Sequence, residues 1–398
     1  MFDHSLDVFY SPLALDFYKE NEHQLLSKLL LKHSRDSLKK DLSLQLESRR
    51  RADGKLPTWL ETSNIVFPPK LNLEQASSEQ TASFKAKLVK YSTSLDLTAG
   101  TGVDSWQFSK NAKKHILVEA DSGLVELAKH NFGVLGIKNT EFVAKTAEGF
   151  IAQNQNHYDL IYIDPSRRKE DGSKAIALEH YSPNVIEMQQ SLLASCNHLL
   201  IKVSPFADIT YLISSFPAYL KEVHIVALSN ECKEVLLLFS KEHTGAPVIK
   251  TVNLDKQHTS QFSFFLSEEL QKPEFAEILD DYLFEPNAAV LKAGAFNALA
   301  KRFGLKKLQE NSHLYTAKQV VSGFPGKTYK IIEDNAAYKL KGDYNKVSIA
   351  TRNFPDKPES IRKRLKMSDG NDFKLFATSL QNKKVFIVGT LVHTNHEF

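Results

Sequence analysis

Cysteine and long apolar runs are both scarce in this chain of 398 residues. Cys196 and Cys232 are its only cysteines, too few for a disulfide framework or a zinc site of the usual spacing. A membrane-spanning helix needs about 20 apolar residues, whereas the longest candidate run, residues 234–240, has the length of a strand. The acidic first 20 residues do not resemble a signal peptide. We therefore expect a soluble cytoplasmic protein without a metal or a membrane partner.

Charge of one sign is not in large excess either. Lysine and arginine number 51 against 47 aspartate and glutamate, a net charge of +4, which permits a polyanionic partner without requiring one. Basic residues cluster at Arg49–Arg51 and at Arg362–Lys366. Taken alone, each cluster fits a solvated helix face better than a contact surface.

The chain is longer than one hydrophobic core usually supports, so we expect several domains. Leucines at helical spacing predict an N-terminal helical region over residues 1–75. Between residues 76 and 243, predicted strands alternate with helices, and this alternation indicates a parallel sheet with covered faces. The seven predicted strands are residues 94–97, 115–119, 140–144, 158–164, 198–204, 222–229 and 234–240.

The connection between the last two of these strands favours one fold class. Only Asn230–Lys233 separate them, too few residues for a helical crossover, so the seventh strand must run antiparallel to the sixth. Class I methyltransferases have such a sheet, and NAD-type Rossmann domains generally do not. We predict an α/β fold with a Rossmann-like seven-stranded methyltransferase sheet. Small α+β domains should follow it, with a helix over 288–303, strands at 329–332, 346–351 and 384–388, and a basic helix near Pro358.

A glycine turn follows the first predicted strand. Gly100 and Gly102 permit backbone torsions that side chains forbid, but Ser105 replaces the third glycine of the dinucleotide pattern. Asp96, just before the turn, would repel a pyrophosphate and attract the ammonium of S-adenosylmethionine (SAM), directly or through water; a turn-capping role is the alternative. The turn residues that we expect to bind SAM are Asp96, Thr98, Ala99, Gly100, Thr101, Gly102 and Asp104.

Three more carboxylates follow the next two strands. Glu119 closes the second strand, where a carboxylate can accept both ribose hydroxyls of a nucleotide. Asp121 could bind the same cofactor or cap the helix that follows. Glu148 comes after the third strand, where it could reach the adenine amine.

The fourth strand ends in Asp164, Pro165, Ser166 and Arg167, which we expect to be catalytic. This segment resembles the Asp/Asn-Pro-Pro-aromatic motif of methyltransferases that modify amino groups. In that motif, an acceptor oxygen and a backbone carbonyl orient the substrate nitrogen for in-line displacement, which is mainly a positioning task. Arg167 replaces the aromatic ring that would stack on a base, which weakens the case for exocyclic base methylation. It could instead pair with a phosphate or carboxylate, or with the nearby Glu170 or Asp171.

A lysine inside the fifth predicted strand is unusual for a buried position. We expect Lys202 to pair with Asp164 or Asp208 across the strand ends, and a catalytic role is the alternative. Asn230–Lys233 could form a hairpin turn or part of the substrate mouth. The residues that we predict to contact substrate are Gln80, Lys85, Arg168 and Lys202.

The combination of segments resembles bacterial class I methyltransferases with a THUMP-like C-terminal domain. The matching segments are residues 79–82 with Lys85, 96–102, 164–168, 202–205 with Asp208, 230–234, 282–286 with Ala293, and 361–366. The resemblance implies a small ferredoxin-like unit with its connector at 244–318 and a THUMP-like domain at 319–398. It also implies SAM as cofactor and RNA as partner, because THUMP domains bind structured RNA.

An RNA methyltransferase is the leading hypothesis, with the C-terminal domain and Arg49–Arg51 contacting phosphates. A methyltransferase of a protein or small acidic metabolite keeps the cofactor and changes the acceptor. A SAM-binding, non-catalytic RNA-binding protein is the third hypothesis. The sequence specifies neither the acceptor atom nor the oligomeric state.

Overall fold

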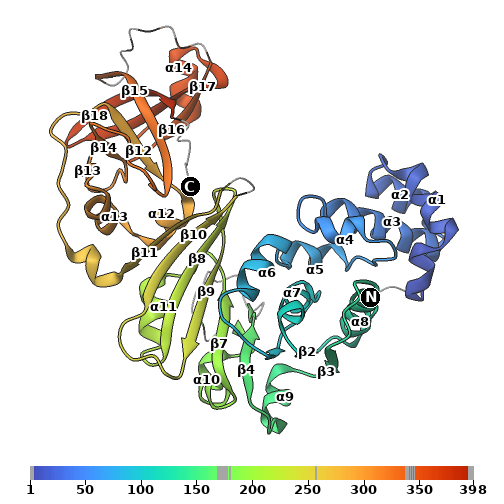
Figure 1. Cartoon of the computed structure of the whole chain (residues 1–398). Coiled ribbons are helices and arrows are strands. Elements are labelled where there is room, and N and C mark those ends of the chain that lie inside the picture. The colour runs from blue at the N-terminus through green and yellow to red at the C-terminus, as the bar shows by residue number, and fades with distance from the viewer. Residues whose placement is uncertain are drawn as a thin grey trace. The chain divides into compact units, whose positions relative to one another are not determined.

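The computed structural model describes residues 4–167, 178, 181–255, 258–336, 340, 342, 344 and 346–392. It divides into two compact units, residues 1–221 with 236–245 and residues 222–235 with 246–398 (Figure 1). No helix in these described ranges is long and apolar enough to cross a membrane.

Helices fill the N-terminal region, as its leucine spacing predicts. They are η1 Leu6–Tyr10, α1 Pro12–Asn21, α2 Leu26–Lys32, α3 Ser37–Arg51, α4 Pro57–Glu61 and α5 Lys70–Gln75. Ser11 and Asp36 cap α1 and α3 by accepting backbone N–H groups through their side chains. The helices share a core with the sheet that follows, where the buried Trp59 and Trp106 rings lie 6.0 Å apart.

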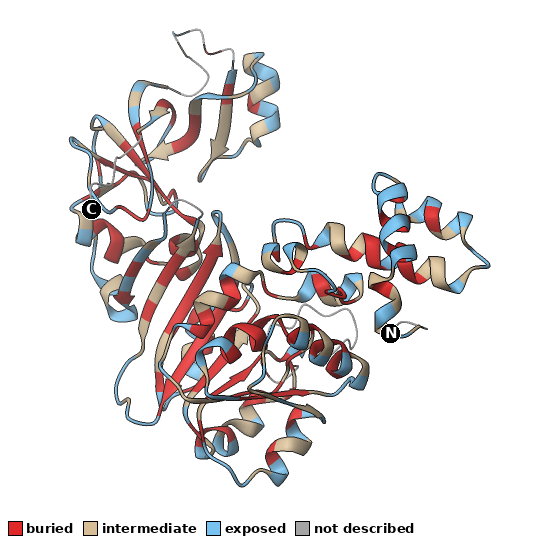
Figure 2. Cartoon of the chain, turned by 45° about the vertical axis from the view of Figure 1, so that its right-hand side comes forward, coloured by how far each residue is buried: buried red, intermediate tan, exposed pale blue. Residues whose placement is uncertain are grey.

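The large sheet has the strand order β11-β10-β8-β9-β7-β4-β1-β2-β3. Its first strands are β1 Thr93–Asp96, β2 Lys114–Glu119, β3 Thr140–Ala144, β4 Tyr158–Ile163 and β7 Cys196–Val203, all paired in parallel. The last two predicted strands are β8 Leu220–Leu228 and β9 Glu231–Ser240. Only two residues join them, so they form an antiparallel hairpin, in which the Ser240 N–H donates to the Tyr219 carbonyl. The predicted fold class is confirmed, and Figure 2 shows the middle strands of the sheet buried.

Helices separate the parallel strands along the chain, and β5 and β6 form a separate two-stranded ribbon. The helices are α6 Glu79–Ala86, α7 Val103–Asn111, α8 Ser122–Val134, α9 Ala147–Gln153, α10 Val185–Ala194 and α11 Ile209–Ser215. The ribbon pairs β5 Ser166–Arg167 with β6 Tyr181–Ser182.

The sheet has two strands more than the seven predicted. β10 Val248–Leu254 pairs in parallel with β8, and β11 Ser260–Phe265 pairs antiparallel with β10. Strand propensity alone does not specify the partner of an edge strand, so the sequence does not reveal these two pairings.

A second, seven-stranded sheet has the order β13-β14-β12-β15-β18-β17-β16. Its strands are β12 Tyr282–Pro286, β13 Lys306–Lys307, β14 Tyr315–Ala317, β15 Gly326–Ala336, β16 Lys346–Thr351, β17 Ser368–Leu380 and β18 Lys383–Leu391. The helical elements of this part are η3 Leu266–Leu270, α12 Ala288–Ala293, α13 Phe296–Phe303 and α14 Pro358–Leu365. The prediction of one helix over 288–303 is wrong, because Gly294 ends α12 in the left-handed region at φ 70°. The prediction also misses β17, whose polar start has the composition of a loop.

Candidate active site

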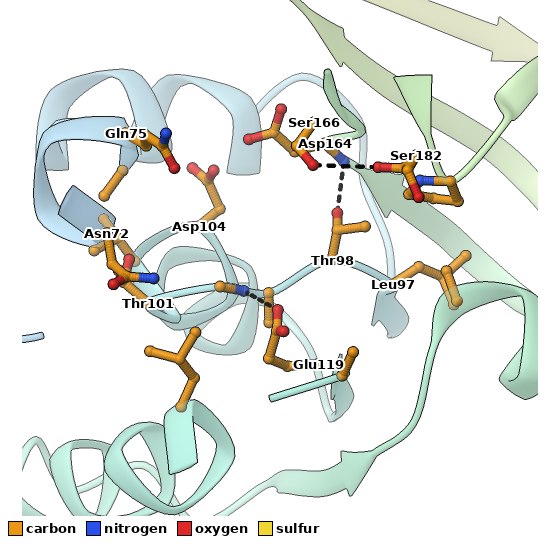
Figure 3. Close-up of a pocket in the computed structure, with 18 of the residues that line it drawn as sticks. Asn72, Gln75, Leu97, Thr98, Thr101, Asp104, Glu119, Asp164, Ser166 and Ser182 are labelled. Carbon is orange, nitrogen blue, oxygen red and sulfur yellow. Dashed lines mark hydrogen bonds between the residues drawn. The ribbon is translucent and has the colours of Figure 1, made fainter. Parts of the chain in front are cut away.

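A pocket of about 410 Å³ opens at the carboxyl ends of β1, β2 and β4 (Figure 3). Ligands of open α/β sheets bind at this edge. Most of the polar residues predicted from the strand ends meet here. The predicted site residues that line the pocket are Thr98, Ala99, Gly100, Thr101, Asp104, Glu119, Glu148, Asp164 and Ser166.

The two glycines of the turn have different roles. Gly100 lines the pocket at φ 53°, and a Cβ added there would meet nothing within 4 Å. Gly102 caps α7 at φ 80°, and a Cβ there would lie 3.3 Å from the Phe132 ring. Gly100 therefore leaves space at the pocket wall, whereas Gly102 permits close packing beneath it and does not line the pocket.

Asp96 lies beneath the turn with no exposed surface. Its Oδ1 accepts the Thr98 N–H at 3.0 Å, and its Oδ2 accepts the Ser105 hydroxyl at 2.7 Å. Burial raises the pKa of Asp96 to about 8, although these two hydrogen bonds oppose the shift. Asp96 does not line the pocket, so its hydrogen bonds fit the turn-capping alternative, and contact with the ammonium of SAM through water stays a prediction.

Asp104 is the ionised carboxylate of this segment. Its Oδ1 lies 3.0 Å from the Lys85 ammonium, and its Oδ2 accepts the hydroxyls of Ser77 and Tyr162, each at 2.9 Å. Burial alone would raise the pKa of Asp104, but the positive charge of Lys85, with help from Lys202 and the hydrogen bonds, holds it below its ordinary value. Asp104 therefore lines the pocket as an ionised carboxylate whose charge Lys85 balances.

Two predicted substrate contacts lie outside the pocket. Lys85 has no exposed surface and donates to the Ser77 hydroxyl at 2.7 Å, so a direct substrate contact by Lys85 is wrong. Gln80 is exposed on α6 and does not line the pocket.

Glu119 links the end of β2 to the glycine turn. Its Oε2 accepts the Gly100 N–H at 2.8 Å, and its Oε1 accepts the Asp121 N–H at 3.0 Å. Each carboxylate oxygen keeps a second lone pair for a ligand. Asp121 caps α8 by accepting from Gly123 and Leu124, and it does not line the pocket. Of its two predicted roles, the structure supports the helix cap.

Asp164 stands at the end of β4 with a fixed orientation. Its backbone N–H donates to the Thr98 hydroxyl at 2.6 Å, and its carboxylate pairs with the Lys202 ammonium. The predicted pairing of Lys202 with Asp164 is therefore confirmed, while Asp208 caps α11 instead. Both partners keep some exposed side-chain surface, 32% for Asp164 and 15% for Lys202.

The rest of the Asp-Pro-Ser-Arg segment is described in part. Pro165 is buried, Ser166 is exposed at the pocket, and the Arg167 backbone pairs with Tyr181. Arg168, which we predict to contact substrate, lies outside the described residues, as do Glu170 and Asp171.

One wall of the pocket is not predicted from the sequence. Asn72 and Gln75 of α5 lie opposite Ser166 and Ser182 (Figure 3). Ser77, in the turn before α6, also lines the pocket. Polar residues in an amphipathic helical region have the pattern of a solvated face, so no signal in the sequence marks them. Among the described residues, no group of three or more His, Cys, Asp or Glu could hold a metal ion.

Comparison with known proteins places the chain in a family. The crystal structure of a candidate methyltransferase from Porphyromonas gingivalis W83 is 30% identical over 99% of this chain and 100% of its own, with a TM-score of 0.87. The chain belongs to the class I methyltransferase family with a THUMP-like domain. Three family models match this methyltransferase: conserved hypothetical protein 95 over residues 79–191, a ferredoxin-like domain over 282–325 and a THUMP domain-like model over 334–390.

Other similar structures cover a smaller part of the methyltransferase. An rRNA methylase from Streptococcus thermophilus is 15% identical over 41% of this chain and 95% of its own, with a TM-score of 0.32. A candidate methyltransferase from Streptococcus mutans, in complex with SAH, is 16% identical over 41% and 96%, with a TM-score of 0.31. No curated protein matches the chain in sequence.

Proposed function

We propose that the chain is a SAM-dependent methyltransferase whose acceptor lies at the Asp164 edge of the pocket. One observation carries the proposal: Gly100, Glu119 and Asp164 converge on a single pocket in a chain of a methyltransferase family. When bound, SAM supplies a methyl group activated by its sulfonium charge.

The pocket residues fit such a cofactor in shape and charge. The open space beside Gly100 admits a ligand against the backbone. The remaining lone pairs of Glu119 would accept ribose hydroxyls, and Glu148, in the first turn of α9, would accept the adenine amine. The negative charge of Asp104 would attract the methionine ammonium, the role that the sequence suggests for Asp96.

Asp164 would orient the acceptor. Lys202 and Thr98 fix its carboxylate and its backbone, respectively. A fixed oxygen at this edge can accept a hydrogen from the acceptor group and hold its lone pair toward the methyl carbon, and such alignment is the main requirement of in-line transfer.

RNA is the acceptor class that we favour. Support comes from the THUMP domain-like match over 334–390 and from α14 within it. Lys363 and Lys366 are exposed there and have no ion pair within the described part of the chain. The other predicted basic cluster is engaged locally: Arg50 donates to three backbone carbonyls, and Arg51 pairs with Glu47.

Methyl transfer into cell extract tests this function. The full chain is incubated with methyl-labelled SAM and extract, and portions are then treated with RNase or with protease. We expect label in macromolecules that only RNase releases, and none with the Asp164→Ala variant. Label that protease releases would instead indicate a protein acceptor. Label in small acids would indicate an acidic metabolite as acceptor. Binding of SAM without transfer to any fraction would favour the non-catalytic RNA-binding protein.

A further inference from the structure

A second pocket, of about 520 Å³, lies entirely within the unit formed by residues 222–235 and 246–398. It gathers the turn between β8 and β9, the end of β10, the start of β11, the end of β12 and the start of β15. The proposed methyl transfer uses none of these residues. Its volume falls within the roughly 300–1,000 Å³ of small-molecule sites.

Amide side chains join the walls of this pocket. The Asn230 N–H donates to Asn253 Oδ1, and Asn230 Oδ1 accepts the Ala288 N–H, both at 2.8 Å. Asn287 Nδ2 donates to the Ser260 hydroxyl at 2.9 Å. Two segments of the family resemblance, residues 230–234 and 282–286, therefore meet here, with amide and hydroxyl groups at the surface of the cavity.

Cations surround the one buried carboxylate of the pocket. Glu285, 8% exposed, accepts from Arg352 at 3.2 Å and from Lys374 at 2.6 Å. Lys327 is exposed directly across the strand pair from Glu285, so both side chains lie on the same face of the sheet. Burial lowers the pKa of Lys374, and the nearby charges of Lys327 and Arg352 add to that effect against the opposing Glu285. Among the described residues, the pocket lining itself carries Lys327, Glu285 and Asp255, while Arg352 and Lys374, which do not line the pocket, pair with Glu285.

We infer that this second pocket binds a nucleoside 5′-phosphate unit, either as a free nucleotide or as one unit of an RNA strand. Lys327 supplies the charge for the phosphate, because it has no ion pair among the described residues. Side-chain amides both donate and accept, so Asn230 and Asn253 can match the mixed edges of a base. Most of the residues that line the pocket have polar side chains, which favours a polar ligand over a lipid chain. For RNA, the inference rests on the proposed function.

Direct binding to the full chain tests this site. The probes are AMP, UMP and a fluorescent single-stranded RNA hexamer, each titrated at low salt, with SAM titrated in parallel. We expect Lys327→Ala to weaken nucleotide or RNA binding about tenfold, since it removes a charge-assisted contact, and to leave SAM binding unchanged. Lys330→Ala is the matched control: it lies on the same strand, is exposed and does not line the pocket.

The outcomes separate the two sources of the ligand. Mononucleotides that bind and displace the hexamer indicate a free-nucleotide site, and hexamer binding alone indicates an RNA subsite. Equal affinity of the Lys327→Ala variant and the wild type for every probe overturns the inference, as does the absence of binding by all three. If SAM fails to bind while a nucleotide binds in a Lys327-dependent way, the proposed function fails and the second site stands.

Discussion

Asp96 and Asp104 flank the same glycine turn and are both buried, yet their pKa values move in opposite directions. Burial without a cation raises the pKa of Asp96 to about 8, whereas Lys85 keeps the pKa of Asp104 below its ordinary value. The partner, rather than the residue type, decides which of them carries charge. Pairing with Lys85 therefore keeps the Asp104 carboxylate ionised at the pocket wall.

Replacing Lys85 by methionine should destabilise the protein strongly. Removing one partner of a buried ion pair leaves an uncompensated charge and typically costs about 3–5 kcal/mol. Urea unfolding measures the loss, with Lys87→Met on the same segment, where the side chain is exposed, as control. A loss no larger than that of the control would contradict the role of the pair.

Asp96 should make stability depend on pH. Its folded pKa, about 8, lies above its ordinary value of 3.8, so the folded state holds a proton that the unfolded state has released. The free energy of unfolding should therefore fall as pH rises from about 4 to about 8. Asp96→Asn removes this titration, so the variant should gain stability relative to wild type between pH 5 and pH 8. Thermal unfolding at the two pH values measures the difference, and a constant difference would refute it.

For single residues, the sequence predicts well which of them stand at the ends of strands. Glu119 and Asp164 end predicted strands and Gly100 follows one, and parallel strands bring their carboxyl ends to one edge. Burial depth is not visible in the sequence, so Asp96 and Lys85 look like contact residues although neither reaches the pocket. Asn72 and Gln75 reach the pocket only because of how the N-terminal helices pack. No local sequence pattern predicts that packing.

At the scale of elements, the turn between β1 and α7 contains two glycines with different roles. Gly102 packs against Phe132, and Gly100 lines the pocket. Alanine at Gly102 would strain a left-handed residue by about 1–2 kcal/mol and press its Cβ to 3.3 Å from Phe132. Alanine at Gly100 would add similar strain but place its methyl group in open space at the pocket. We expect Gly102→Ala to lower the free energy of unfolding more, and Gly100→Ala to lower SAM affinity more. Denaturant unfolding and calorimetry on both variants check this, and the reverse ranking would contradict it.

The elements themselves are largely predictable where periodicity is strong. The alternation of strands and helices and the short β8–β9 connection predict seven strands with an antiparallel last pair, because so short a connection permits only a hairpin. β10 and β11 join the same sheet through pairings that propensity cannot specify. β17 is missed since its polar first half resembles a loop, and the break between α12 and α13 depends on the backbone of Gly294.

At the scale of the whole molecule, the N-terminal helices and the methyltransferase sheet share one core. Trp59 on α4 is fully buried and packs edge-on against Trp106 of α7, in a cluster that also contains Leu117 of β2. The N-terminal helical region is thus part of the folded unit that holds the pocket. The amino-acid composition of these helices does not predict that they share a core with the sheet.

Trp59→Ala should therefore destabilise the unit that contains the pocket. Truncating a buried tryptophan typically costs about 3–5 kcal/mol. Leu31→Ala, at a side chain 83% exposed on α2, is the control and should change stability by less than about 0.5 kcal/mol. Urea unfolding followed by circular dichroism compares the two, and a small effect of Trp59→Ala would show that the shared core contributes little.

Titration calorimetry of the full chain with SAM measures whether the pocket beside Gly100 binds this cofactor. We predict one SAM site per chain, with affinity reduced at least about tenfold by Glu119→Ala, which removes the ribose acceptor, and unchanged by Glu126→Ala, an exposed carboxylate on α8. Absence of binding at millimolar SAM, binding of NAD in its place, or equal affinity of the Glu119→Ala variant would contradict the account.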